Sequence, residues 1–435
     1  MVTGMDHALS DTGRRRAGNP SDARILLASM IGTTIEFFDF FAYGTAAVLC
    51  FPQLFFPTHD PASALLQSLA TFSIAFFARP FGAAIFGHFG DRIGRKATLV
   101  AALMTMGLST AVIGILPTYA SIGVAAPLLL ALARVGQGIG LGGEWGGATL
   151  LAAENAPPHR RGWYAAFPQF GSPTGFVLST AVFYLLTTTL SDADFLAWGW
   201  RVPFLFSILL VGIGLYVRLK LIETPEFQMI LDRQATVSVP IATILKRHKR
   251  DLALGTVIGS LNFVLFYLIA VFLLSWGGSK LGYPRQDLLV GVMIGACFEI
   301  LTIPVSGLLA DRFGRRRVLL VSTIAIGLLG LILAPLFESG LAGVLAFYIA
   351  SLCFQGLNYG SIGAALAAPF PAEVRYTGTA MAFNFAGILG GSLVPYIATW
   401  LASAYGLAAV GGYLTCAAIA ALAALVLMEN DDRTR

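Results

Sequence analysis

The sequence predicts an all-α membrane protein with twelve transmembrane helices in two pseudo-symmetric six-helix bundles. Three observations favour this fold class: a composition poor in charge, twelve long apolar runs and a duplicated loop motif. Of the 435 residues, 57% are hydrophobic and 12% are charged, which is about half the charged fraction of a typical soluble domain. Most of the chain is therefore expected to lie in lipid rather than in water.

Twelve apolar runs are long enough to cross a bilayer, since a spanning helix needs about 20 mostly apolar residues. They are bounded by charges, prolines or glycines and cover residues 24–51, 64–89, 97–116, 124–150, 163–190, 200–221, 251–276, 286–310, 318–337, 342–369, 376–404 and 407–428. These runs predict five parts: an N-terminal arm (1–23), a first six-helix bundle (24–221), a linker (222–250), a second six-helix bundle (251–428) and a tail (429–435).

Lysine and arginine are spread unevenly over the loops between these runs. If the N-terminus is cytoplasmic, most of the 28 lysines and arginines lie on that side, as cytoplasmic loops of membrane proteins require. The sequence therefore predicts a multi-pass protein of the cell membrane, with the arm, the linker and the tail all cytoplasmic. The net charge of +5 is read as a topology signal, and no basic patch with interleaved aromatics indicates nucleic acid.

A loop motif occurs twice. The sequence GDRIGRK at residues 90–96 recurs as ADRFGRR at residues 310–316, and each copy follows the second apolar run of its bundle. A second frame, three glycines and one phenylalanine at positions 162, 167, 171 and 175, recurs at 378, 383, 387 and 391. Repeats with the same orientation predict a two-fold axis along the membrane normal and a path between the bundles.

The loop GHFGDRIGRK at residues 87–96 resembles the signature loop of the major facilitator superfamily, and the resemblance extends from about residue 24 to 428. Three further segments resemble the metabolite:proton symporters, a group that includes shikimate, 2-oxoglutarate and proline/betaine carriers. They are IEFFDFFAYG at 35–44, RPFG at 79–82, and RVGQG at 134–138 running to GGEWGG at 142–147. The resemblance implies the major facilitator fold and secondary active transport by alternating access.

The signature loop and residues near it are expected to act in gating. Its glycines allow a tight reversal of the chain, and Asp91 can pair with arginines or meet a helix N-terminus. Glu154 is expected near Arg92, Arg95 or Arg160. Arg79 is expected to extend toward the membrane interface or to brace the loop, rather than to bind a solute. The gating set is Arg79, Gly87, Gly90, Asp91, Arg92, Gly94, Arg95, Lys96, Glu144, Glu154, Asp311, Arg312, Gly314 and Arg315.

Charged residues within the apolar runs point to a wet or paired interior, because each costs at least ~2.5 kcal/mol near the bilayer centre. Asp39 lies ~22 Å along the first run, and Arg134 of the fourth run falls at a similar depth. Glu36 shares a helix face with Asp39, and repulsion between the two favours a proton on one of them. We expect Glu36, Asp39 and Arg134 to couple protons, with Asp39 alternating between Arg134 and a proton. The alternative is a static ion pair.

Several polar side chains at mid-helix depth are expected to contact the solute. Each alone is more often an interhelical hydrogen bond than a ligand contact, but as a set they are the candidates for specificity. The set is Arg134, Glu299, Asn262, Tyr267, Gln355, Asn358, Tyr359 and Asn384.

The expected function is proton-coupled uptake of a small polar metabolite, an organic acid such as a shikimate-like or dicarboxylic acid. A symporter of zwitterionic osmolytes such as proline or betaine, a drug-efflux antiporter and a non-transporting sensor remain alternatives. An enzyme is not expected, because all five histidines lie in termini or loops and no phosphate-binding motif is present. The expected partners are the solute, protons and the lipid bilayer; no cofactor, metal or nucleic acid is expected, and the protein is expected to work as a monomer.

Overall fold

The computed structural model describes residues 20–220 and 240–428, which we call the first and second halves. Within these residues all regular structure is helical, and twelve helices are long and apolar enough to cross a membrane. Their ends agree with the twelve predicted runs to within a few residues, so the predicted fold class is confirmed. Most of the predicted arm (1–23) and linker (222–250), and all of the tail (429–435), lie outside the described residues.

The helices of the first half follow one another with short connections. They are α1 (Pro20–Leu49), α2 (Phe51–Phe55), α3 (Pro61–Gly90), α4 (Arg95–Ile115), α5 (Tyr119–Ile122), α6 (Ala125–Glu154), η1 (Pro158–Arg160), α7 (Arg161–Ala166), η2 (Phe167–Phe170), α8 (Gly171–Thr189), α9 (Asp192–Ala197), η3 (Gly199–Arg201) and α10 (Val202–Leu219).

The second half begins with a short helix inside the predicted linker. Its helices are α12 (Pro240–Arg247), α13 (Lys249–Tyr267), η4 (Leu268–Leu273), α14 (Leu274–Ser279), α15 (Arg285–Phe313), α16 (Arg315–Glu338), α17 (Leu341–Ala367), α18 (Arg375–Gly387), η5 (Ile388–Ser392), α19 (Val394–Tyr405) and α20 (Leu407–Leu427). The segments η4 and η5 are π-helical and interrupt two of the long apolar helices.

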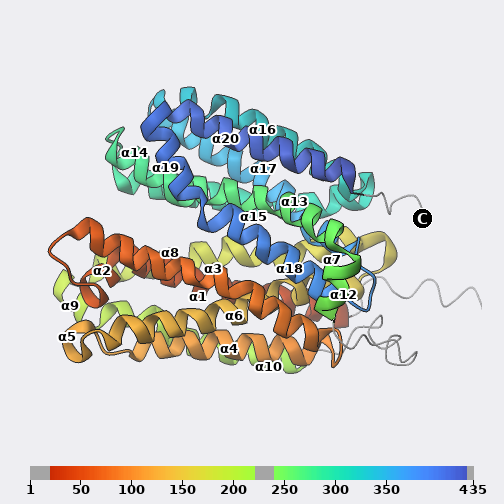
Figure 1. The fold of residues 1–435 in the computed structure, drawn as a ribbon, viewed down its shortest axis with the longest axis horizontal. Coiled ribbons are helices and arrows are strands. Elements are labelled where there is room, and N and C mark those ends of the chain that lie inside the picture. Colours follow the sequence, from red (N-terminus) through yellow and green to blue (C-terminus); the bar gives the residue numbers. More distant parts are fainter. Residues whose placement is uncertain (1–19, 221–239, 429–435) are drawn as a thin grey trace, which may run out of the picture.

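The two halves lie side by side with their long helices running in the same general direction (Figure 1). Helices α7, α12 and the start of α18 lie at one end, which we call the α7/α12 end, while α2, α5, α9 and α14 lie at the other. Between the halves, α18 packs against α3 and α6, and α15 packs against α7. The boundary between the halves is therefore built mainly from these helices.

Two glycines allow this close approach at the α7/α12 end. A Cβ atom added to Gly87 would lie 2.8 Å from the Cα of Thr377, and one added to Gly307 would lie 2.9 Å from the Cα of Trp163. Both distances are too short for carbon atoms that are not bonded. Because the two glycines occupy equivalent positions of the sequence repeat, the same helix contact is made twice.

Candidate functional site

A small cavity of about 30 Å³ lies between the halves. The first half contributes Phe37, Phe40, Phe41, Arg79 and Ser172 to its wall, and the second half contributes Asn262, Phe263, Phe266, Tyr267, Gln355, Tyr359 and Phe383. Four of the polar residues expected to contact a solute are therefore together here. A volume of this size holds one or two water molecules, so the halves must separate before anything larger can enter.

Arg79, which was expected to have a structural role, is the charged residue on the cavity wall. Its side chain is buried, and its guanidinium lies 5.4 Å from the ring centres of Phe40 and Phe76 and 5.9 Å from that of Phe263. Phe263 approaches from the second half, so the environment of Arg79 depends on both halves. Its Nε and Nη2 atoms have no hydrogen-bond partner among the described residues.

Other predicted solute contacts are not on the cavity wall. Asn358 donates from Nδ2 to Ser322 Oγ (2.9 Å) and Thr323 Oγ1 (3.0 Å). Asn384 donates to the carbonyl oxygen of Gly142 at 2.9 Å. Both asparagines therefore make the interhelical bonds that were weighed as the alternative. Glu299 is buried in α15 and does not line the cavity, although it interacts electrostatically with Tyr359 of the wall.

Asp39 and Arg134 are buried in the first half and are connected through two neutral side chains. Arg134 Nη1 donates to Gln137 Oε1 (2.9 Å), Gln137 Nε2 donates to Thr110 Oγ1 (2.8 Å), and Thr110 Oγ1 donates to Asp39 Oδ2 (2.9 Å). The guanidinium also lies 4.1 Å from the ring centre of Tyr43. No direct ion pair joins Asp39 and Arg134 in this part of the described chain, and the chain of hydrogen bonds through Gln137 and Thr110 connects them instead.

Glu36 and Glu144 share one arginine, Arg218, that is not among the residues singled out from the sequence. Arg218, in the last turn of α10, is buried; its Nη2 contacts Glu144 Oε1 and lies 3.9 Å from Glu36 Oε1. Its Nη1 donates to the carbonyl oxygen of Leu99 at 2.6 Å. The partner of Glu144 is therefore Arg218 rather than a residue of the signature loop. Arg218 lies inside the apolar run 200–221, and that position was the signal that could have identified it.

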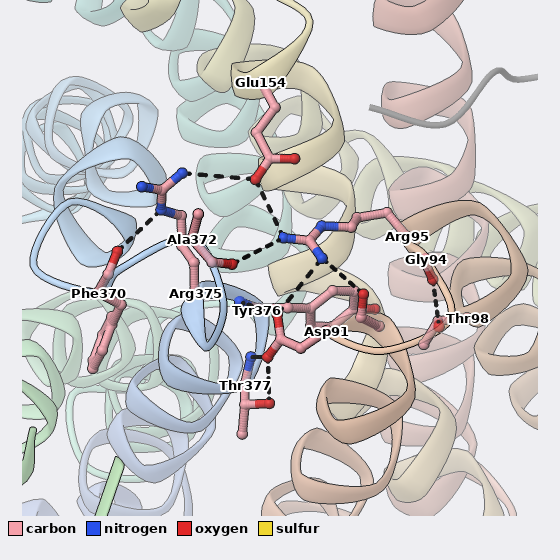
Figure 2. A network of polar contacts seen from close by, with 11 residues as sticks. Asp91, Gly94, Arg95, Thr98, Glu154, Phe370, Ala372, Arg375, Tyr376 and Thr377 are labelled. Carbon is pink, nitrogen blue, oxygen red and sulfur yellow. Dashed lines mark hydrogen bonds and ion pairs between the residues drawn. The ribbon is translucent and has the colours of Figure 1, made fainter. Parts of the chain in front are cut away.

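The signature loop caps a helix of the opposite half (Figure 2). The carboxylate of Asp91 accepts hydrogen bonds from the backbone N–H of Tyr376 (3.2 Å) and Thr377 (3.0 Å) and from Thr377 Oγ1 (2.7 Å), at the start of α18. Arg95 Nη1 lies 3.6 Å from the same carboxylate. Burial raises the pKa of Asp91 to about 6, and the positive charge of Arg95 and the bonds from Thr377 and Tyr376 partly oppose that rise.

Arg95 extends this contact to two more charged residues. Its Nη1 donates to the carbonyl oxygen of Gly90 (2.8 Å), and its Nη2 lies 3.5 Å from Glu154 Oε1. Arg375 of the second half lies 3.8 Å from the same Glu154 oxygen, and Figure 2 draws this contact. The expected contact between Glu154 and Arg95 is confirmed. We call this set of contacts centred on Asp91 the Asp91 latch.

The second copy of the loop makes the reciprocal contact. Asp311 accepts hydrogen bonds from the backbone N–H of Gly162 (2.7 Å) and Trp163 (3.0 Å) at the start of α7 in the first half. We call this contact the Asp311 latch. In both loops the glycine three residues after the aspartate has a positive φ, 117° at Gly94 and 87° at Gly314, a conformation that favours glycine.

A ring stack beside the cavity also joins the halves. Trp145 of α6 and Phe383 of α18 have ring centres 3.6 Å apart and planes inclined by 7°. Trp145 Nε1 donates to Gln169 Oε1 at 2.9 Å, which fixes the orientation of the indole. Because Phe383 also lines the cavity, movement of α18 away from α6 would alter the stack and the cavity together.

Comparison with known proteins places this geometry in a family. Residues 25–253 match the family model "Sugar (and other) transporter", and residues 298–435 match "Major Facilitator Superfamily". The inner membrane metabolite transport protein YhjE of Escherichia coli (strain K12) is 53% identical over 413 residues, covering 94% of each chain. The shikimate transporter of the same strain is 36% identical and covers 94% of this chain and 95% of its own.

A third relative and one solved structure extend the comparison. The proline/betaine transporter of Salmonella typhimurium is 36% identical and covers 92% of this chain and 80% of its own. The proton:xylose symporter XylE bound to 6-bromo-6-deoxy-D-glucose superposes with a TM-score of 0.73 at 20% identity, covering 92% of this chain and 94% of its own. That likeness shows the fold. The chain belongs to the major facilitator superfamily and is a multi-pass inner-membrane metabolite transporter, not an enzyme.

Proposed function

We propose that this protein is a proton-coupled symporter that takes up a small organic acid by alternating access of the central cavity. Two observations support this proposal best. The ionisable side chains of Glu36, Asp39 and Arg134 are buried in the first half, and both halves contribute residues to the cavity wall. Such side chains are retained in a membrane interior mainly where they serve a water-accessible or proton path. The relative named as a proton:xylose symporter has the same fold.

Asp39 is the proposed proton carrier. Its Oδ1 atom has no hydrogen-bond partner within the described residues, and its Oδ2 atom accepts from Thr110. Ionised Asp39 would attract Arg134, which requires Gln137 and Thr110 to give up their present bonds. Protonated Asp39 would leave Arg134 with Gln137. Glu36, one helical turn before Asp39, is a second candidate, because both of its carboxylate oxygens lack hydrogen-bond partners and its nearest described cation is Arg218.

Alternating access follows from the two latches. We propose that the bundles of residues 24–221 and 251–428 move as units and that the α7/α12 end faces the cytoplasm. Both termini would then be cytoplasmic. Opening that end would require release of Asp91 from α18 and of Asp311 from α7. Since the cavity and both latches are complete within one chain, we also propose that the monomer is the working unit.

The function can be tested with purified protein in liposomes. An inward proton gradient should drive accumulation of a radiolabelled substrate chosen from organic acids and betaines, and Asp39→Asn should abolish accumulation while exchange of substrate without a gradient continues. Arg134→Lys should impair the same step. Asp192→Asn, which changes an exposed acid at the start of α9, is the matched control.

Three results would contradict the proposal in different ways. Normal gradient-driven accumulation by Asp39→Asn would reject Asp39 as the proton carrier. Expulsion of solute in response to the inward gradient would indicate an antiporter. The absence of exchange for every solute class would favour a non-transporting sensor.

A further inference from the structure

We propose that Arg79 binds the carboxylate of the transported solute and that this solute is a monocarboxylic acid carrying hydroxyl or other hydrogen-bond donors. This inference rests on the proposed function and narrows it to one substrate class. Arg79 was predicted to belong to the gating set, and its side chain lines the cavity.

The first step is the charge of Arg79. Guanidinium groups remain charged in proteins, and a buried charge is strongly unfavourable unless a counter-charge and hydrogen bonds compensate it. The described residues provide no ion pair for Arg79 and no acid on the cavity wall. Glu36 is close enough to interact electrostatically with Arg79, but its nearest cation is Arg218. The cavity wall therefore has one positive charge and no acid, and Glu36 interacts with that charge from outside the wall.

The second observation is that two N–H donors of Arg79 have no hydrogen-bond partner among the described residues. The rings of Phe40, Phe76 and Phe263 lie near the guanidinium and stabilise its charge by cation–π interaction, but they cannot accept the N–H groups along its edge as an oxygen would. The two partnerless atoms are Nε and Nη2, which form one edge of the planar group. That edge matches the two oxygens of a carboxylate in a bidentate contact.

The third step concerns the opposite half. Asn262 Oδ1 and Gln355 Oε1 are buried, belong to residues of the cavity wall and lack hydrogen-bond partners among the described residues. The amide of Asn262 is oriented because its Nδ2 donates to Asn358 Oδ1 at 2.9 Å. Buried acceptors need donors, so the second half is suited to hydroxyl or N–H groups of a solute.

These features together discriminate between solute classes. A dicarboxylate would leave its second charge without a cation on the wall. A betaine would bring an ammonium group beside Arg79, where no acid on the cavity wall balances it. A hydroxylated monocarboxylate matches both sides, with its carboxylate on the first half and its hydroxyls on the second. Its binding would draw the two halves together.

The test is a thermal-shift measurement on the purified full chain, because a ligand that binds the folded state raises its melting temperature. Four pools are compared at equal concentration: hydroxy monocarboxylates (shikimate, quinate, lactate, gluconate), dicarboxylates (succinate, 2-oxoglutarate), betaines with proline, and neutral polyols. The monocarboxylate pool should stabilise the protein, and the methyl esters of its active members should not. Arg79→Gln should weaken that binding about ten- to hundredfold.

Two further variants complete the design. Arg79→Lys keeps the charge but loses the bidentate edge, so it should bind with intermediate affinity. Arg317→Gln, which removes an exposed arginine at the start of α16, is the control and should bind as the unmodified protein does. If Arg79→Gln does not fold, Gln355→Glu replaces it: this nearly isosteric change adds an acid to the same wall and should also weaken monocarboxylate binding at least tenfold.

Each other outcome overturns the inference. Stabilisation by the methyl esters, by dicarboxylates or by betaines in place of monocarboxylates would reject the substrate class while leaving a carrier function intact. Monocarboxylate binding that persists in Arg79→Gln or in Gln355→Glu would reject the role of Arg79. If no pool stabilises the protein and no pool is exchanged across liposomes, the carrier function itself is contradicted as well.

Discussion

The Asp91 latch and the Asp311 latch are built from the same repeated motif but differ in what surrounds them. Each aspartate accepts two backbone N–H groups at the start of a helix in the opposite half. Asp91 is buried and also contacts Thr377 Oγ1 and Arg95, whereas Asp311 is exposed. Each copy of the repeat therefore places an aspartate at the start of a helix in the opposite half. The residues around each aspartate determine how strongly that helix is held.

The largest effect is expected from Asp91→Asn. The single amide oxygen replaces the two carboxylate oxygens that accept from Tyr376 and Thr377, and the buried positive charge of Arg95 loses one of its two neighbouring acids. Breaking one partner of a buried pair costs about 3 kcal/mol, or about a hundredfold in the opening equilibrium. Hydrogen exchange of the Tyr376 and Thr377 amides, followed by mass spectrometry, should accelerate by that factor. Unchanged exchange would mean that the Asp91 latch does not hold α18.

The second largest effect is expected where the two latches are alike, at the glycine contacts beside them. Gly87→Ala and Gly307→Ala each place a methyl group within 2.8–2.9 Å of a backbone carbon of the opposite half. Such overpacking costs about 1–3 kcal/mol, and the cost should be similar on both sides. Both variants should raise exchange at the start of the opposing helix, α18 for Gly87→Ala and α7 for Gly307→Ala. A large difference between them would show that the helix contacts, and not only the aspartates, are unequal.

A smaller effect is expected from Asp311→Asn. Its carboxylate is exposed, and water can replace part of each hydrogen bond that is lost. Exchange of the Gly162 and Trp163 amides should rise about fivefold. An effect as large as that of Asp91→Asn would remove the proposed difference between the latches.

The smallest effect is a pH dependence of the Asp91 latch. Burial raises the pKa of Asp91 from 3.8 to about 6 in the closed latch. Opening the latch to water returns the pKa to its ordinary value, so Asp91 releases a proton on opening when the pH lies between 3.8 and about 6. The contribution of Asp91 is therefore most favourable to closure at low pH and is lost as the pH rises through 6. From pH 7 to pH 5.5, protection of the Thr377 amide, corrected for intrinsic exchange, should increase about fourfold. Asp91→Asn should abolish this dependence, and a decrease in protection would contradict the assignment.

The sequence predicted the helices and loops well because both are local features. Apolar runs with charged ends define the spans, and the positive φ at Gly94 and Gly314 explains why glycine occurs at equivalent positions of both loops. The ability of Asp91 to meet a helix N-terminus was also predicted. The identity of that helix was not, because Tyr376 and Thr377 are distant in sequence and only the packing of the two halves brings them there.

The prediction was less successful for residues whose role depends on the opposite half or on neutral neighbours. Depth along one helix placed Arg79 near the signature loop, but depth does not reveal that Phe263 of the second half approaches its guanidinium. Depth along the helices predicted a pair of Asp39 and Arg134, yet Gln137 and Thr110 lie between them. An uncharged glutamine within an apolar run gives no sign of that role.

The stack of Trp145 on Phe383 has a practical consequence. An indole pressed face to face against a phenyl ring has a fluorescence emission that depends on that contact, and the two rings belong to opposite halves. A chain in which the other tryptophans are replaced by phenylalanine would carry one intrinsic reporter. Its emission would move to longer wavelength when water reaches the indole, so a single stopped-flow trace could time the parting of the halves without any attached dye.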